Sequence, residues 1–109
     1  MRPKSVNYYD SAELETSAII KASPGTLFSI TGVNSKGSAQ YIQLHDSATL
    51  PADTAVPKIV LRVAGEENFF YELKEIGRFF KNGIVVTNSS TLATKNIGSA
   101  DCWYSAQYV

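Results

Sequence analysis

The chain has 109 residues, of which 44% are hydrophobic and 18% charged, and its ten basic residues balance its ten acidic ones. This length predicts one domain that can bury a core without a metal or a disulfide. Zero net charge excludes the basic surface that nonspecific binding to nucleic acid or to an anionic membrane requires. We therefore expect no nucleic-acid partner and no membrane partner, and we expect partners to be recognised by shape and apolar contact.

Residues 1–11 have no period of two or of 3.6, so we expect an extended arm that lies against a partner or along the edge of a sheet. Residues 12–22 alternate between apolar and polar side chains, which predicts a strand with one wet face. Residues 26–33 and 39–45 also alternate, and the polar segment 34–38 between them predicts a hairpin. Residues 46–57 contain two prolines and no period, which predicts a loop that crosses between sheets or contacts another element.

Strands are expected again at 58–64 and at 69–73, where Phe69, Tyr71 and Leu73 share one face. Apolar residues in 71–81 fall at roughly helical spacing, but Gly77 and the aromatic content favour no more than one helical turn. Asn82-Gly83 is the strongest turn signal of the chain.

The run of β-branched residues at 84–86 is typical of a strand buried on both faces. A short polar strand or edge is expected at 91–95, and a last strand at 102–109. In that last strand one face should carry Cys102, Tyr104, Ala106 and Tyr108.

Seven or eight short strands at intervals near ten residues predict an all-β fold, an antiparallel two-sheet β-sandwich or a jelly-roll-like arrangement. We expect the sandwich to span residues 12–109 and to follow the extended N-terminal arm, residues 1–11. The N-terminal sequence lacks the apolar core of a signal peptide, and no apolar run approaches the ~20 residues that span a bilayer. These features predict a soluble protein that is made inside the cell.

The sequence offers little for catalysis, because His45 is its only histidine and Cys102 its only cysteine. One residue of each kind cannot fill a tetrahedral metal shell, and we expect no metal, no cofactor and no disulfide. His45 could pair with Cys102 in space, but a hydrogen-bonded or exposed histidine at a strand end is favoured. Glu13 and Glu15 are interpreted as a solvated strand face. We therefore predict that the protein is not an enzyme.

Aromatic residues remain as candidates for contact. The consecutive pairs Phe69-Phe70 and Phe79-Phe80 must each place one ring on either side of a strand. Some ring is then exposed unless a second subunit covers it, and exposed apolar groups often mark an interface. The candidate interface residues are Arg2, Tyr8, Tyr9, Phe70 and Phe80.

Two long segments carry a resemblance to a known group. The sequence PGTLFSITGVNSKGSAQYIQLHDSATLPADTAVPKIVLRVAGEENFFYEL, followed by FFKNGIVVTNSSTLATKNIGSADCWYSAQY, resembles small virion-associated proteins of tailed bacteriophages. The resemblance covers residues 18–109 and includes no catalytic motif. It implies a β-sandwich on the phage particle, commonly a homotrimer, that acts as a capsid decoration or cement protein. Its partner would be the major capsid protein, and its location the virion after synthesis in the host cytoplasm.

Two other readings stay open. One is a carbohydrate- or receptor-binding module on the phage head, tail or fibre, which predicts exposed Trp103 or Tyr104 rings beside Asp or Asn side chains. The other is a tail-completion or connector component.

Overall fold

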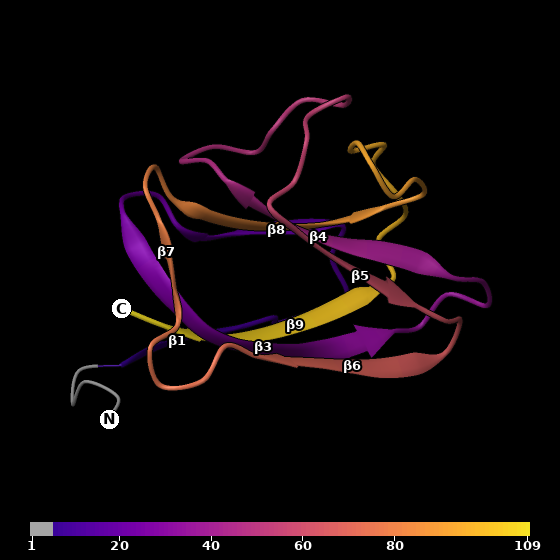
Figure 1. Cartoon of the computed structure of the whole chain (residues 1–109). Helices are drawn as coiled ribbons and strands as arrows, with labels where there is room; N and C mark the ends of the chain where they lie inside the picture. The colour runs from indigo at the N-terminus through magenta and orange to yellow at the C-terminus, as the bar shows by residue number, and fades with distance from the viewer. Residues whose placement is uncertain (1–5) are drawn as a thin grey trace.

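The computed structural model describes residues 6–109, which form two antiparallel sheets packed face to face (Figure 1). The strands are β1 (Asn7–Asp10), β2 (Ser17–Lys21), β3 (Gly25–Asn34), β4 (Gln40–Asp46), β5 (Ile59–Val63), β6 (Glu67–Glu72), β7 (Arg78–Phe80), β8 (Ile84–Ser89) and β9 (Cys102–Tyr108). Sheet A has the order β1-β9-β3-β6, with β7 also paired to β3, and sheet B has the order β2-β8-β4-β5. The described residues form no helix, and the predicted all-β sandwich is confirmed.

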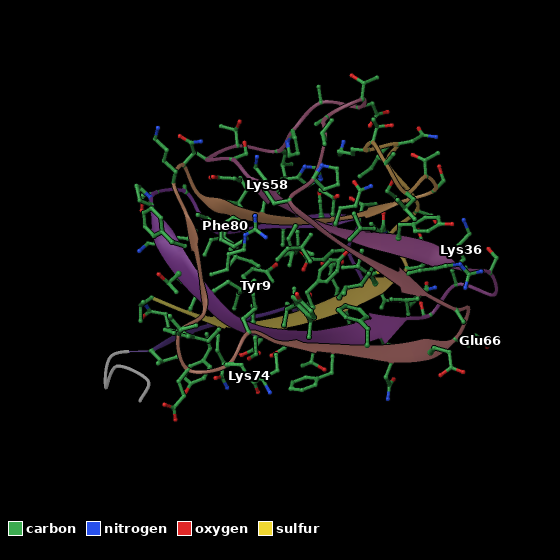
Figure 2. All side chains as sticks on the ribbon, in the orientation of Figure 1. Tyr9, Lys36, Lys58, Glu66, Lys74 and Phe80 are labelled. Atoms are coloured by element: carbon green, nitrogen blue, oxygen red, sulfur yellow. The ribbon has the colours of Figure 1, made fainter. Side chains whose placement is uncertain are left out.

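The core lies between the two sheets, and Figure 2 shows side chains of both sheets filling this space. β9 follows the predicted alternation, since Cys102, Tyr104 and Ala106 are buried while Trp103 reaches the surface. All six residues of β8 are buried, as expected for a strand covered on both faces. One face of β8 meets the core, and the other lies under loops that cover sheet B.

The predicted hairpin of residues 26–33 and 39–45 is wrong. β3 belongs to sheet A and β4 to sheet B, so the segment between them crosses from one sheet to the other. The buried side chain of Asn34 holds this crossing, because its Nδ2 donates to the carbonyl oxygens of Ser38 (3.1 Å) and Ala64 (3.1 Å). Alternation identified both strands, but it carries no information on which partner each strand pairs with.

Residues 47–58 connect β4 and β5, which are neighbours in sheet B. The expected crossing between sheets is therefore absent here, and the alternative prediction of a contact is correct. The loop joins residues 90–98 through backbone hydrogen bonds from Thr54 N to Lys95 O and from Lys95 N to Ala55 O, both 2.7 Å. Residues 91–95, expected as a short strand, form part of this loop pair (Figure 1).

The described part of the N-terminal arm is extended, and it lies along the edge of sheet A. Asn7–Asp10 pairs with β9 as strand β1, so these residues of the arm belong to sheet A. The segment expected to hold at most one helical turn contains a single turn, closed by a hydrogen bond of 3.1 Å from Gly77 N to Leu73 O. Gly77 has φ of 68°, a value that glycine adopts without steric cost.

Candidate interaction surface

The outer face of sheet A carries several exposed aromatic rings. Strand register places Phe70, Thr31, Ser105 and Asp10 in one row across the sheet. The Ser105 hydroxyl donates to Asp10 Oδ1 over 2.6 Å, which links the strands at one end of this row. Phe70 is 66% exposed at the other end.

Two further rings lie on the same face. Tyr8 on β1 is 64% exposed, and Trp103 on β9 is 37% exposed. Trp103 is opposite Val33 of β3, and Val33 is in turn opposite Asn68 of β6. This aromatic face, defined by Tyr8, Phe70 and Trp103, has one exposed ring on each of β1, β6 and β9.

The structure separates the five residues predicted for an interface. Arg2 lies outside the described residues. Tyr8 and Phe70 are both on the aromatic face, although at opposite edges of sheet A. Tyr9 is half-buried on the inner side of β1, where it packs against the core.

The choice of Phe80 must be corrected. Phe80 is 1% exposed and belongs to the core, where it is opposite Gly25, because it is the inward ring of its consecutive pair. Phe79 is the outward ring and is 64% exposed. An interface at this pair would therefore use Phe79.

Tyr9 belongs to a small hydrogen-bonded cluster where the chain passes from sheet A to sheet B. The Tyr9 and Ser11 hydroxyls both donate to Glu15 Oε2 over 2.6 Å. Burial, together with the adjacent Glu15 carboxylate, raises the pKa of Tyr9 to about 12. Glu15 is thus a structural acceptor and differs from the solvated carboxylate expected from the sequence.

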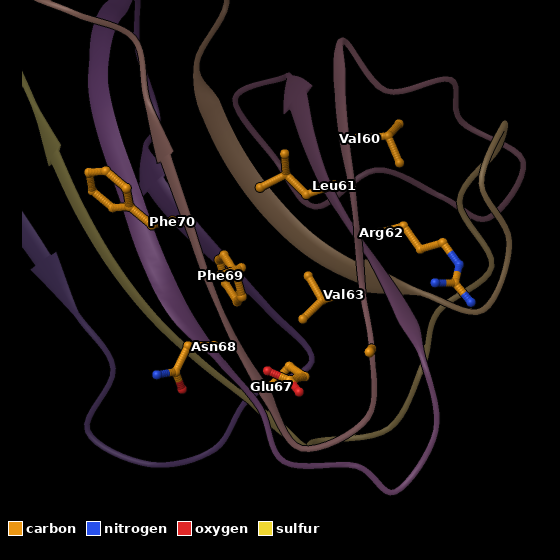
Figure 3. Close-up of a pocket in the computed structure, with 9 residues that line it drawn as sticks. Val60, Leu61, Arg62, Val63, Glu67, Asn68, Phe69 and Phe70 are labelled. Atoms are coloured by element: carbon orange, nitrogen blue, oxygen red, sulfur yellow. The ribbon is translucent and has the colours of Figure 1, made fainter.

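A groove of about 420 Å³ opens between β5 and β6, where the edges of the two sheets meet. Figure 3 shows Leu61 and Val63 of β5 facing Phe69 of β6, with Phe70 on the opposite side of the β6 backbone. Arg62 and Glu67 add one positive and one negative charge to the lining. The lining of the groove therefore includes both apolar and charged side chains, and it contains no cluster of catalytic groups.

His45 lies on the outer face of sheet B, beneath the covering loops, and is 3% exposed. Its Nε2 is 3.2 Å from both Gln43 Oε1 and Thr87 Oγ1. Burial is the main cause that lowers the pKa of His45 to about 4, and the positive charge of Lys95 adds to the effect. Gln43 in turn donates from Nε2 to carbonyl oxygens of the 90–98 loop, including Thr91 O at 3.0 Å.

Cys102 lies in the core, away from His45, so the possible pairing of these two residues is not formed. Its Sγ is 3.5 Å from Asn88 Nδ2 and 3.6 Å from Gln40 Nε2. Burial raises the pKa of the Cys102 thiol, which keeps it protonated and unreactive at neutral pH. Within residues 6–109 there is no group of three or more His, Cys, Asp or Glu side chains that could hold a metal ion.

The two aromatic residues expected for sugar binding have different positions. Tyr104 is fully buried, and its hydroxyl donates to Thr16 O over 3.1 Å. Trp103 keeps part of its ring in solvent. The expectation of an exposed ring therefore holds for Trp103 and not for Tyr104.

Sequence reasoning missed two features of this surface, Phe79 and the groove. β7 has only three residues, too few for alternation to indicate which ring faces inward. The groove depends on β5 and β6 being edge strands of different sheets, and strand order cannot be predicted from side-chain alternation. An apolar residue on an edge strand can be recognised only after the strand order is known.

No protein-family model matches this chain, and no match was found among curated proteins or solved structures. No helix in the described part of the chain is long and apolar enough to cross a membrane.

Proposed function

We propose that this protein is a non-enzymatic structural protein of a phage virion, a capsid decoration or cement protein that binds the major capsid protein and further copies of itself. The observation that carries the docking role is the aromatic face, where large apolar rings remain exposed on an open sheet. The phage context is supported by the sequence resemblance, which also implies a homotrimer. Binding would stabilise the particle by burying these rings between neighbouring subunits.

Binding to particles can be measured by co-sedimentation of the labelled chain with capsids that lack it. The double variant Tyr8→Ser/Phe70→Ser removes two exposed rings, and we expect its binding to fall at least tenfold. Leu92→Ser is a matched control, because Leu92 is 53% exposed on a loop over sheet B. Equal binding by the wild type and the double variant would contradict the proposed use of the aromatic face.

The N-terminal arm can be tested separately. A chain that lacks residues 2–5 keeps all of β1, whereas removal of residues 1–11 would also remove a strand of sheet A. We expect the shorter deletion to weaken binding to the particle and to leave the urea midpoint unchanged. Unchanged binding would assign no role in docking to residues 2–5.

A carbohydrate-binding module is the second candidate, and the exposed part of the Trp103 ring favours it. Sugar rings stack on exposed aromatic faces, and such stacking would change the fluorescence of this single tryptophan. Binding on a glycan array, followed by fluorescence titration of the wild type, tests the idea, and Trp103→Ala is expected to lose binding on the array. If the wild type binds no glycan, the carbohydrate-binding candidate is rejected and the decoration role remains.

A further inference from the structure

β6 is an edge strand whose outer side has no partner strand among the described residues. Phe69 O accepts from the Thr31 hydroxyl at 2.9 Å, and Leu73 N donates to Phe28 O at 2.8 Å, so the backbone groups of these odd-numbered residues point toward β3. Backbone direction alternates along a strand. The N–H and C=O groups of Asn68 and Phe70 therefore point away from sheet A, as a template for another strand.

The residues of β6 are arranged almost symmetrically around Phe70. Glu66 and Lys74 lie four residues before and after it, carry opposite charges, and are both exposed. Both also have left-handed backbone conformations, with φ of 57° and 63°, and they mark the two ends of the strand (Figure 2). Inside these ends, Phe69 and Tyr71 flank Phe70 on the inner side of the strand.

We propose that β6 pairs in antiparallel register with β6 of a second copy of this chain, about a two-fold axis at Phe70. In this register Phe70 is opposite its own copy, and Asn68 is opposite Glu72 of the second copy. The N–H and C=O groups of Phe70 point outward, so the central pair of Phe70 residues exchanges two backbone hydrogen bonds. The inner side gains an aromatic pair, because Phe69 is opposite the second copy's Tyr71.

Charge complementarity favours a second copy of the chain as the partner, and it also favours this register. Glu66 of each copy is brought opposite Lys74 of the other, so the two-fold axis creates two favourable pairs at once. A shift that makes Phe69 the centre places Phe70 opposite the second copy's Asn68 and separates Glu66 from Lys74, so both favourable charge pairs are lost. A shift in the other direction, with Tyr71 at the centre, places Phe70 against Glu72 and loses the central aromatic pair.

The pairing also covers apolar surface that is open in the single chain. The groove between β5 and β6 opens on the same side as the free edge of β6, so the second copy would close it (Figure 3). The two aromatic faces become one continuous face across the axis. This inference rests on the self-association in the proposed function, but it replaces the homotrimer that the resemblance implies with a two-fold dimer, and it does not depend on the capsid as partner.

A strand contact of six residues is at the small end of stable interfaces, so we expect a concentration-dependent equilibrium. Analytical ultracentrifugation of the full chain from low to high micromolar concentration should show the mass doubling. Phe70→Arg places two positive charges opposite each other and should raise the dissociation constant by at least tenfold. Phe79→Arg is the matched control, because Phe79 is 64% exposed against 66% for Phe70, and it should leave the constant unchanged.

The register can be tested by exchanging charges. Lys74→Glu sets two carboxylates opposite each other at both ends of the contact and should weaken the dimer by about tenfold at low salt. The double variant Glu66→Lys/Lys74→Glu restores opposite charges and should recover the wild-type constant. Urea midpoints equal to that of the wild type will show that these exposed substitutions leave the fold intact.

The proposal is overturned if the wild type stays monomeric at every concentration, or if Phe70→Arg associates as the wild type does. It is also overturned if the charge exchange fails to recover association. If the chain dimerises in this way but does not bind particles, the decoration role is rejected and the pairing through β6 is not. A monomeric chain that binds particles would reject only the pairing through β6.

Discussion

Lys95 Nζ lies 3.0 Å from Asp53 Oδ1, and this ion pair joins the two long loops that cover sheet B. The ammonium group is nearly buried, whereas the carboxylate is half-exposed. Asp53 Oδ1 also accepts from Ile97 N at 3.2 Å, and its pKa is lowered by these two hydrogen bonds, that from Lys95 first. Residues 47–58 and 90–98 therefore form one connected cover over His45.

Removing the carboxylate should loosen this cover. Asp53→Ala leaves the Lys95 ammonium without its anion in a site with little water, which is less favourable than removing both charges. We expect backbone amides in both loops to exchange hydrogen about tenfold faster or more, while β8 keeps its protection. Lys95→Met should show a smaller effect, because it removes the charge that needs a partner. Equal exchange in the wild type and Asp53→Ala would show that the backbone bonds alone hold the loops.

Acidification should destabilise the fold through His45. Its pKa is about 4 in the folded chain and near 6.5 when unfolded, so below pH 6.5 the unfolded state binds the proton more tightly. The free energy of unfolding should therefore fall as pH drops from about 6.5 to 4, by up to about 3 kcal/mol in total. Urea denaturation at pH 7 and pH 5 measures this loss.

The control for that experiment is His45→Gln, which cannot titrate in this window. Its free energy of unfolding should be nearly constant between pH 7 and pH 5. The lowered pKa values of Asp46 and Asp53 also make stability depend on pH, but only when those carboxylates become protonated, near and below pH 4. A wild-type stability that is flat between pH 7 and pH 5 would reject the assigned role of His45.

The neighbouring rings of β7 should respond very differently to truncation. Phe80→Ala opens a cavity in the core and should lower the free energy of unfolding by about 3–5 kcal/mol. Phe79→Ala removes an exposed ring and should change it by about 0.5 kcal/mol or less. Similar losses for both variants, measured by urea denaturation, would mean that the two rings are not divided between core and surface.

Gly32 in the middle of β3 cannot accept a side chain. A Cβ atom there would lie 1.9 Å from Trp103 O and 2.6 Å from Phe69 Cζ, and the first of these is backbone of the adjacent strand. We expect Gly32→Ala to cost about 1–3 kcal/mol or more, because the strands must separate. Gly37→Ala is a suitable control, since no atom lies within 4 Å of the added carbon. A Gly32→Ala chain as stable as the control would contradict the close approach.

The sequence predicted strands well because side-chain alternation is a local property. The alternating strand predicted at residues 102–109 is correct, and so is the fully buried strand predicted at residues 84–86. Pairing partners are not local, and the hairpin prediction failed because the polar segment 34–38 looks the same in a hairpin and in a crossing between sheets. The crossing is held by a hydrogen bond from Asn34 to the carbonyl oxygen of Ala64. Because Ala64 is far from Asn34 in the sequence, this contact could not be predicted from the local pattern.

The same distinction applies to the candidate surface. Consecutive phenylalanines correctly indicated that some rings would be exposed, and Phe70 is such a ring. Which ring of the Phe79-Phe80 pair faces outward could not be predicted, because β7 is too short and its pairing with β3 was unknown.

The position of β9 has a consequence for how the protein folds. This last strand of the sequence lies inside sheet A, between the first strand and β3. Sheet A therefore cannot be completed until residues up to Tyr108 have left the ribosome, and before then β1 has no hydrogen-bonding partner. Such long-range pairing makes folding slow, and it leaves the edge of β3 and the rings of β6 exposed to other nascent chains meanwhile. We expect folding in milliseconds to seconds, and chaperone dependence when synthesis is rapid.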